Sequence, residues 1–316
     1  MNSRVKELDF LKCIFIILMI IFHLVYIGDS YPYAKQVVYT FHMSAFLVIS
    51  GYLNNVNKKI KAFGRSLLWI FIPYVCMETG YVIMSAILPV REKITELSAG
   101  LLLHKAIIAP MGPYWYLHTL MLCNASYYLM YRMTNKWKGI TRFILLGILL
   151  YGLSELKLLT FANAIYFLAG VAIRQSGSNI IRIFQPSLLA LFPLIILCYF
   201  PENLNRGTLA GVTITYLVIS LLLAIYTYLT EQIKRILLYI GSNTLVILLF
   251  SPVFTILSKL YLPFFTFDAT GICFTIVSVV FVICGCFGVT YIFDRLHISP
   301  YFLGKKQMLP PYSSAD

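Results

Sequence analysis

The chain has 316 residues, of which 60% are hydrophobic and only 12% are charged, and its formal net charge is +13. Soluble domains carry about a quarter charged residues, so this composition excludes an ordinary soluble protein. The apolar residues form runs of about 20 residues, the length at which a helix crosses a hydrocarbon core about 30 Å thick. Lipid offers the backbone no hydrogen bonds, so these runs must be helical.

Ten such runs follow one another along the chain, and we expect an all-α, polytopic transmembrane helix bundle of about ten spans. They lie near residues 10–27, 36–53, 66–88, 114–131, 143–155, 158–173, 186–200, 208–229, 237–257 and 271–293. Only Glu155-Leu156-Lys157 separates the fifth from the sixth. In the longest connection, Pro89 to Pro113, the apolar centre from Leu97 to Ile108 is expected to lie along the membrane surface. No polar block is long enough for a second domain, so residues 1–316 are interpreted as one domain.

The seven cysteines all lie within the apolar runs, and no histidine accompanies them at metal-ligand spacing. A disulfide framework has a polar, loop-rich setting, which is absent around these cysteines. Free cysteine packs as a small hydrophobic residue. We therefore expect buried packing cysteines and no metal site.

The basic residues are divided unevenly between the two ends of the predicted spans. With the N-terminus inside, 18 of the 25 Lys and Arg residues fall in cytoplasmic segments, Arg4 among them, and seven fall outside: Lys35, Arg91, Lys93, Lys105, Lys157, Arg206 and Lys259. Cytoplasmic loops of membrane proteins are enriched in Lys and Arg. This predicts a multi-pass protein of a cell membrane, expected to be a bacterial cytoplasmic membrane, with both termini cytoplasmic and lipids around it. It also explains the positive charge without nucleic acid.

The first run begins with positive charge, as a signal peptide does. It has no small-x-small cleavage site and contains ionisable residues, so we expect it to remain as a helix of the mature protein. Two of these residues are Lys12 and His23. Their separation is three helical turns plus about 20°, which places them on nearly one face, roughly 16 Å apart along the axis. Lys12 by itself is typical of a snorkelling lysine, whereas His23 is either a structural histidine or a proton-transfer group.

Four further residues near or within predicted spans are candidates for the same site. His42 lies on the outer side of the second span, and Glu78 lies in the middle of the third. Trp115 begins the fourth span, and His118 lies one turn deeper. Each has an ordinary alternative: an interfacial polar residue, a pairing group between helices, or part of an aromatic belt.

A run of four cations, Lys58, Lys59, Lys61 and Arg65, precedes the third span on the predicted cytoplasmic side. The positive-inside rule explains such a run by topology alone. Four cations beside a helix start would also bind phosphate groups, through their charge and through the helix dipole.

Five segments carry a pattern in chain order. The first is Glu7-Leu8-Asp9-Phe10-Leu11-Lys12, followed after ten residues by His23, and the second is Phe41-His42-Met43-Ser44-Ala45-Phe46-Leu47-Val48-Ile49-Ser50-Gly51-Tyr52-Leu53. The others are Arg65 followed by Pro73-Tyr74, then Pro113-Tyr114-Trp115-Tyr116-Leu117, and Gly241-Ser242-Asn243-Thr244-Leu245. The ordered set resembles the integral membrane acyltransferase-3 family, whose members O-acylate surface glycans and related acceptors with acyl-CoA.

The resemblance implies acyl transfer from a cytoplasmic acyl-CoA, expected to be acetyl-CoA, to a hydroxyl of a glycan or lipid-linked sugar at the outer face. It implies that His23 is the catalytic residue, as general base or as transient acyl carrier. Lys12, Lys61 and Arg65 lie on the side where CoA phosphates would bind. The residues expected to support the site are His42, Glu78, Trp115 and His118.

The sequence departs from the family pattern at four positions. Lys12 stands where arginine is common, Ser44 replaces a proline, Trp69 occupies a position that is often basic, and Ser251 stands where many members carry histidine. Because of Ser251, the ninth span is left out of the catalytic assignment. The alternative function is a non-enzymatic exporter of polysaccharide or lipid-linked sugar, because ten-helix exporters share this composition. Transporters often contain paired inverted repeats, and the sequence displays none.

Overall fold

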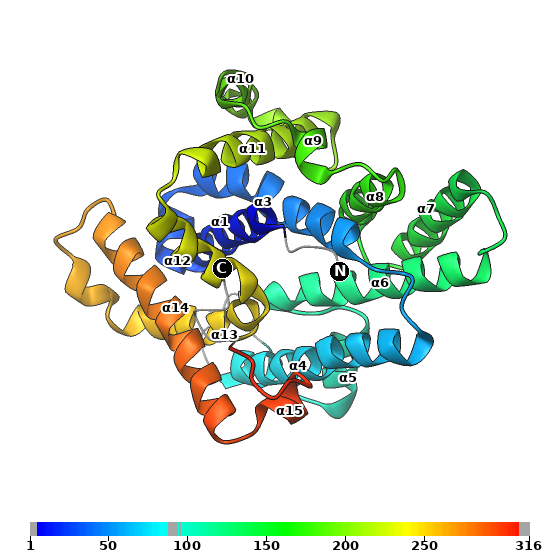
Figure 1. Cartoon of the computed structure of the whole chain (residues 1–316). Coiled ribbons are helices and arrows are strands. Elements are labelled where there is room, and N and C mark those ends of the chain that lie inside the picture. The colour runs from blue at the N-terminus through cyan, green and yellow to red at the C-terminus, as the bar shows by residue number, and fades with distance from the viewer. Residues whose placement is uncertain (1–4, 88–93, 95, 310–316) are drawn as a thin grey trace.

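The computed structural model describes residues 5–87, 94 and 96–309, and these residues form helices and no strands. The expected all-α class is therefore confirmed for the described part of the chain. The α-helices, labelled in Figure 1, are α1 Lys6–His23, α2 Val25–Ser30, α3 Pro32–Leu53, α4 Ile60–Ile87, α5 Ala99–Ile107, α6 Trp115–Met133, α7 Gly139–Glu155, α8 Phe161–Gln175, α9 Ile180–Phe184, α10 Leu191–Tyr199, α11 Leu209–Tyr228, α12 Glu231–Ser242, α13 Thr244–Leu257, α14 Ile272–Arg295 and α15 Ser299–Phe302. Short 3-10 helices are η1 Gly112–Tyr114, η2 Leu188–Ala190, η3 Pro201–Asn203, η4 Ser258–Leu260 and η5 Leu262–Phe265.

Helix α1 lies at the centre of the bundle and packs against α3, α11, α12, α13 and α14 (Figure 1). Glycines allow neighbouring backbones to approach closely. A Cβ atom on Gly241 of α12 would lie 1.8 Å from the carbonyl oxygen of Asp9 in α1. A Cβ atom on Gly170 of α8 would lie 2.0 Å from the carbonyl oxygen of Val48 in α3. Small residues at such crossings are typical of helices packed within a membrane.

The outer surface of the bundle is strongly apolar. Not one residue of α10 is buried, and on α14 the side chains of Ile276 and Val280 are 61% and 56% exposed. Four helices, α3, α4, α11 and α14, are long and apolar enough to cross a membrane, and the bent pair α12–α13 would make a fifth. Exposed apolar surface of this extent indicates a membrane protein.

Two of the ten predicted runs are broken, which corrects their boundaries. The first run, 10–27, is interrupted at Leu24, whose backbone is extended with ψ 108° and whose side chain packs against Ile27 and Phe274. The ninth run, 237–257, bends by 79° between α12 and α13. At that bend the Asn243 side-chain amide donates to the carbonyl oxygen of Tyr239, at 2.8 Å, and so replaces a backbone helical bond.

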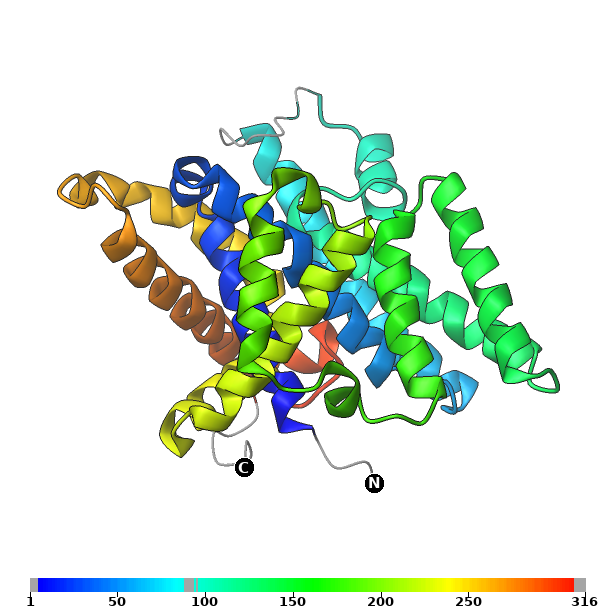
Figure 2. The same cartoon turned by 90° about the horizontal axis from the view of Figure 1, so that it is seen from above.

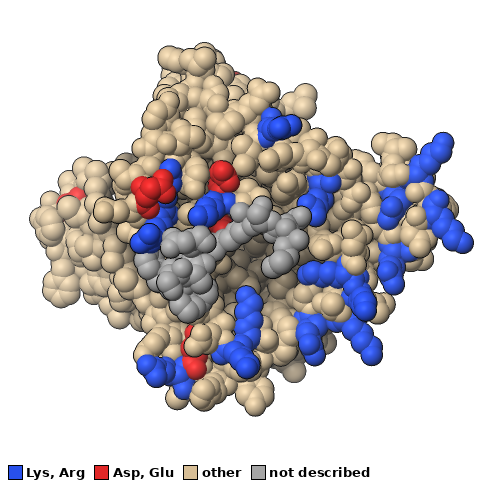
Figure 3. Space-filling view, viewed as in Figure 1, with Lys and Arg blue, Asp and Glu red and all other residues tan. Residues whose placement is uncertain are grey.

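The connection between α4 and η1 contains α5, within the apolar segment from Leu97 to Ile108; that this segment lies along the membrane surface stays a prediction. Residues 88–93 and 95 of that connection, Arg91 and Lys93 among them, lie outside the described residues, as does Arg4. The start of α1 and the short α15 lie toward the same side of the molecule, and α2 and α5 lie toward the opposite side (Figure 2). The face that Figure 3 presents carries many Lys and Arg side chains and few Asp and Glu.

Candidate active site

His23 occupies the last position of α1, immediately before the break at Leu24. Its Nδ1 lies 2.7 Å from the carbonyl oxygen of Met19, one turn earlier. A carbonyl oxygen can only accept, so this bond assigns the proton to Nδ1 and leaves Nε2 of the neutral ring as an acceptor. The break in the helix therefore places a proton-accepting nitrogen at a helix end, where it is half-buried.

His42 on α3 is held in the same way. Its Nδ1 lies 2.7 Å from the carbonyl oxygen of Val38, and its side chain is buried. The ring of Tyr39 lies near both histidines, with its centroid 6.2 Å from that of His23 and 5.2 Å from that of His42. Both imidazoles thus use Nδ1 for their own backbone, and Nε2 of each remains the atom that could meet a ligand.

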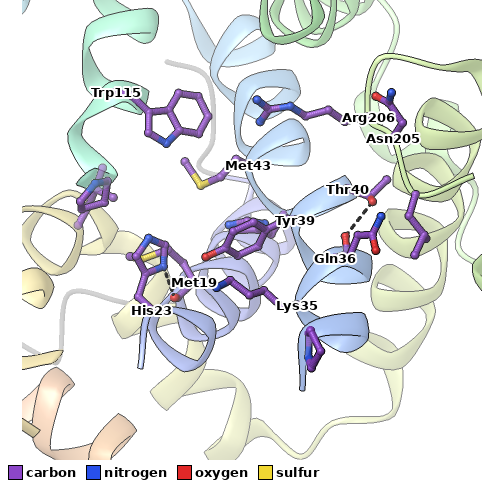
Figure 4. Close-up of a pocket in the computed structure, with 15 residues that line it drawn as sticks. Met19, His23, Lys35, Gln36, Tyr39, Thr40, Met43, Trp115, Asn205 and Arg206 are labelled. Atoms are coloured by element: carbon purple, nitrogen blue, oxygen red, sulfur yellow. Dashed lines mark hydrogen bonds between the residues drawn. The ribbon is translucent and has the colours of Figure 1, made fainter. Parts of the chain in front are cut away.

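The two histidines line one cavity of about 680 Å³ (Figure 4). The lining comes from α1, α3, α13, the start of α6 and the connection between η3 and α11: Met19, His23, Pro32, Lys35, Gln36, Tyr39, Thr40, His42, Met43, Pro113, Trp115, Leu204, Asn205, Arg206 and Leu248. This lining includes two formally cationic side chains and no carboxylate. We call it the outer cavity.

In the outer cavity the Arg206 side chain extends toward Trp115 (Figure 4). The guanidinium carbon lies 5.4 Å from the Trp115 ring centroid, a distance typical of a cation–π contact. Tyr166 donates its hydroxyl hydrogen to the carbonyl oxygen of Arg206 at 2.7 Å, which fixes this connection. Burial lowers the pKa of the Arg206 guanidinium, and the nearby Tyr166 phenol opposes that shift.

Trp115 is positioned by the turn that precedes α6. Glu78 of α4 accepts a hydrogen bond from the backbone amide of Met111 at 2.6 Å. Tyr114 donates its hydroxyl hydrogen to the carbonyl oxygen of Leu249 in α13 at 2.8 Å. Gly112 has a φ of 54° and lies against the ring of Tyr81, which leaves no room for a Cβ atom. Glu78 is thus placed as a support for the turn that carries Trp115, away from the cavity lining.

A second cavity, of about 260 Å³, lies along α1 beyond the outer cavity, and we call it the inner cavity. Lys12 lines it, and the Lys12 ammonium pairs with the Asp9 carboxylate at 2.6 Å. Met43 and Leu248 line both cavities. The two residues that the sequence places on one face of the first helix therefore line two cavities that adjoin at Met43 and Leu248.

The remaining predicted residues lie elsewhere. His118 has its Nε2 2.7 Å from the carbonyl oxygen of Ile107, which ties α6 to α5, and it lines neither cavity. Lys61 and Arg65 are exposed on the first turns of α4 and also line neither cavity. The structure thus brings together His23, His42 and Trp115, places Lys12 in the adjoining cavity, and separates the rest.

Sequence reasoning missed Lys35 and Arg206 as cavity residues, because it assigned both to outer connections by charge counting. Their polar neighbours Gln36 and Asn205 gave no signal of a cavity, since polar residues are usual in the connections between apolar runs. Their convergence on one cavity depends on contacts between distant segments.

Searches among curated proteins and among solved structures gave no significant match. The family model described as "Acyltransferase domain", that of the acyltransferase-3 family, matches residues 5–291. The matched segment runs from the start of α1 into α14. It therefore contains every residue that lines the two cavities. The histidine-lined cavity lies inside an apolar helical bundle, and the family model matches most of the chain. The chain therefore belongs to the acyltransferase-3 family of membrane proteins.

Proposed function

We propose that this protein is a membrane O-acyltransferase, which moves an acyl group, expected to be acetyl, from cytoplasmic acyl-CoA to a hydroxyl of an extracytoplasmic glycan or lipid-linked sugar. The observation that carries the proposal is the pair of cavities along α1, which adjoin at Met43 and Leu248. The inner cavity suits the slender arm of a thioester donor, and the larger outer cavity suits a sugar acceptor. The reacting carbon would lie where the two adjoin, within reach of His23.

In this proposal His23 acts as the general base. Its Nε2 accepts the proton of the acceptor hydroxyl while that oxygen attacks the thioester carbonyl carbon. The new C–O bond forms, the C–S bond breaks, and the imidazolium returns its proton to the leaving thiolate. The Met19 carbonyl, which accepts from Nδ1, stabilises the imidazolium during the step. In the acyl-carrier alternative, the same Nε2 attacks the thioester first.

The outer cavity favours an acceptor rich in oxygen atoms. Gln36 and Asn205 offer amide groups that both donate and accept, as hydroxyls require. Trp115 offers a ring face, and the Arg206 guanidinium beside it adds five potential donors. Met19, Met43 and Leu248 form an apolar part of the lining, which would limit the water around a bound thioester.

We also propose that about ten helical segments lie across the membrane and that both termini are cytoplasmic. The face rich in Lys and Arg (Figure 3) supports this orientation through the positive-inside rule. Single cysteines can be placed at Lys105 and Lys157 for the outside and at Lys59 and Lys136 for the inside, after removal of the exposed native cysteines Cys76, Cys273 and Cys284. An impermeant maleimide should label the first pair in intact cells; labelling of the second pair instead would reverse the orientation.

The proposed reaction is tested by asking whether the purified protein binds acyl-CoA and transfers its label. Isotopically labelled acetyl-CoA should bind to the detergent-purified protein, and the label should appear in glycan or lipid-linked sugar of the host membranes. A glycan exporter has no reason to hold acyl-CoA. If the well-folded protein neither binds the donor nor moves the label, the acyltransferase assignment from CoA is wrong.

A further inference from the structure

Another cavity, which shares no lining residue with the two described above, lies at the end of α3 between α6, α7 and α8. Its volume is about 200 Å³, and its lining is almost entirely polar: Asn54, Asn55, Val56, Asn57, Tyr127, Tyr131, Arg142, Arg174 and Gln175. We call it the arginine cavity. Its lining includes two arginines and no carboxylate. The family resemblance assigned none of these residues a role.

The arginine cavity contains buried polar atoms that lack a hydrogen-bond partner. Arg142 donates through Nη2 to the carbonyl oxygen of Tyr131 at 2.7 Å, and its guanidinium carbon lies 4.1 Å from the Tyr131 ring centroid. Its Nε is buried and has no partner among the described residues. The Tyr131 hydroxyl is also buried and without a partner, on a side chain only 3% exposed. Native proteins seldom leave such groups unpaired, so they indicate a ligand.

Arg174 provides the second cation. Its guanidinium carbon lies 5.9 Å from the ring centroid of Tyr52, which orients the side chain at the end of α8. In the part of the chain that the structure describes, neither Arg142 nor Arg174 forms a salt bridge with a carboxylate. Two guanidinium groups around one polar cavity, without an internal counter-ion, are suited to a phosphate group, which they bind through paired N–H donors.

The arginine cavity adjoins the inner cavity. Asn54 lines the arginine cavity and Asn124 lines the inner cavity, and the Asn54 amide donates to the Asn124 side-chain oxygen at 2.6 Å. A ligand whose phosphate is held by the arginines could therefore extend from the arginine cavity into the inner cavity, toward Met43 and Leu248. A lysine and an arginine on the surface of α4, Lys61 and Arg65, have no comparable enclosure.

We propose that the arginine cavity is a phosphate-binding site, in which Arg142, Arg174 and the Tyr131 hydroxyl hold one phosphate group. Its position beside the inner cavity points to a phosphate of the CoA donor, and this identification rests on the function proposed above. The headgroup of an anionic lipid or free inorganic phosphate would present the same chemistry, so the experiment must separate the three sources.

The experiment measures ligand binding to the purified full-length protein and to four variants. Arg142→Gln and Arg174→Gln remove one cation each, and Tyr131→Phe removes only the orphan hydroxyl. Arg182→Gln is the matched control, because Arg182 is exposed on α9 and lines none of the three cavities. The probes are CoA, dephospho-CoA, inorganic phosphate, and nanodiscs with or without phosphatidylglycerol. Thermal unfolding and size-exclusion profiles identify any variant that fails to fold.

We expect each arginine variant to bind CoA about tenfold more weakly, since a hydrogen bond to a charged group is lost, with the control unchanged. Tyr131→Phe should give a smaller loss without lower thermal stability, because it leaves no unpaired group behind. If the wild type binds dephospho-CoA more weakly than CoA, and the arginine variants bind the two equally, the bound group is the 3′-phosphate. Stabilisation by phosphatidylglycerol or phosphate that the arginine variants lose would support the site with a lipid or free phosphate as its ligand.

The proposal is overturned if the folded arginine variants match the wild type and the control with every probe, in which case the cavity holds water. This outcome is distinguishable from failure of the proposed function. If the wild type does not bind CoA at all, the acyl-CoA donor is wrong, while the phosphate and lipid probes still report on the arginine cavity.

Discussion

The outer and inner cavities differ in how their polar groups are used, although α1, α3, α6 and α13 line both. In the inner cavity most of the polar groups are paired with one another or with nearby side chains. Lys12 pairs with Asp9, and Ser50 and Tyr116 share a hydrogen bond of 2.9 Å. In the outer cavity His23 and His42 use one ring nitrogen each for the backbone and keep the other for a ligand.

The proposed function uses this difference, since the inner cavity would hold the donor and the outer cavity would hold the acceptor and the reacting groups. A cavity whose polar groups are already paired presents a mostly apolar wall, along which an extended thioester arm can lie without strong attachment. A cavity with unused acceptors and cationic side chains can bind and activate a polar acceptor. The predictions below test this contrast, from the largest expected effect to the smallest.

The largest effect is expected at His23. His23→Ala should lower the rate of acyl transfer by about 10² to 10⁴, the usual contribution of a general base, while CoA binding persists. His23→Gln is the stricter variant, because glutamine forms hydrogen bonds but does not take a proton near neutral pH. Transfer of labelled acetyl groups and donor binding are measured side by side. A glutamine variant with near wild-type transfer would make His23 structural and would move the chemistry to His42.

The junction between the cavities gives the next largest effect. Met43→Trp should fill the space shared by the two cavities and lower transfer by about 10², because a reacting group displaced by about 1 Å loses much of its rate. Donor and acceptor binding should each be retained. Met43→Leu, which keeps a similar volume, is the control and should transfer at nearly the wild-type rate. Equal activity of the tryptophan variant would show that the acyl group does not pass this junction.

Arg206 tests the acceptor side of the contrast. Arg206→Gln should raise the KM for the acceptor about tenfold, since a hydrogen bond from a charged group is lost, and leave donor binding unchanged. Steady-state kinetics at varied acceptor concentration separate KM from kcat. Arg206→Lys keeps the charge but not the planar group that contacts Trp115, so partial recovery is expected. A change in donor affinity alone would place Arg206 outside the acceptor site.

The smallest effect is expected on the donor side. Lys12→Ala should weaken acyl-CoA binding by about two- to fivefold, which corresponds to the modest strength of partly exposed charge interactions. Arg65→Ala, on the exposed start of α4, should have a weaker effect that disappears at high salt, since charges are screened over about 10 Å at 0.1 M. Binding by both variants that equals the wild type at low and at high salt would remove these residues from the donor site.

Sequence alone was sufficient for the fold class and the position of most helices. Apolar runs of helical length can be recognised locally, because each backbone must satisfy its own hydrogen bonds in lipid. The breaks at Leu24 and Asn243 were not predicted, since neither is a proline or glycine. Leu24 packs against Phe274, which is distant in the chain, whereas Asn243 bonds to Tyr239 four residues earlier, a local bond that the apolar pattern does not reveal. His23 was found as a candidate because an ionisable side chain is unusual in an apolar helix.

Only the tertiary structure decided which of the candidates share a cavity. In the sequence, His42 and Trp115 could not be distinguished as site candidates from four other residues. These four line neither cavity: Glu78, His118, Lys61 and Arg65. Arg206 and Lys35 lie in the outer cavity, and Arg142 and Arg174 in another, through contacts between segments far apart in the chain. The sequence alone indicated that a polar group in an apolar segment has either a structural partner or a functional role. Which of the two applies depends on the neighbours that helix packing brings to it, because a hydrogen bond acts over about 3 Å and cannot be inferred from a residue's position along the chain.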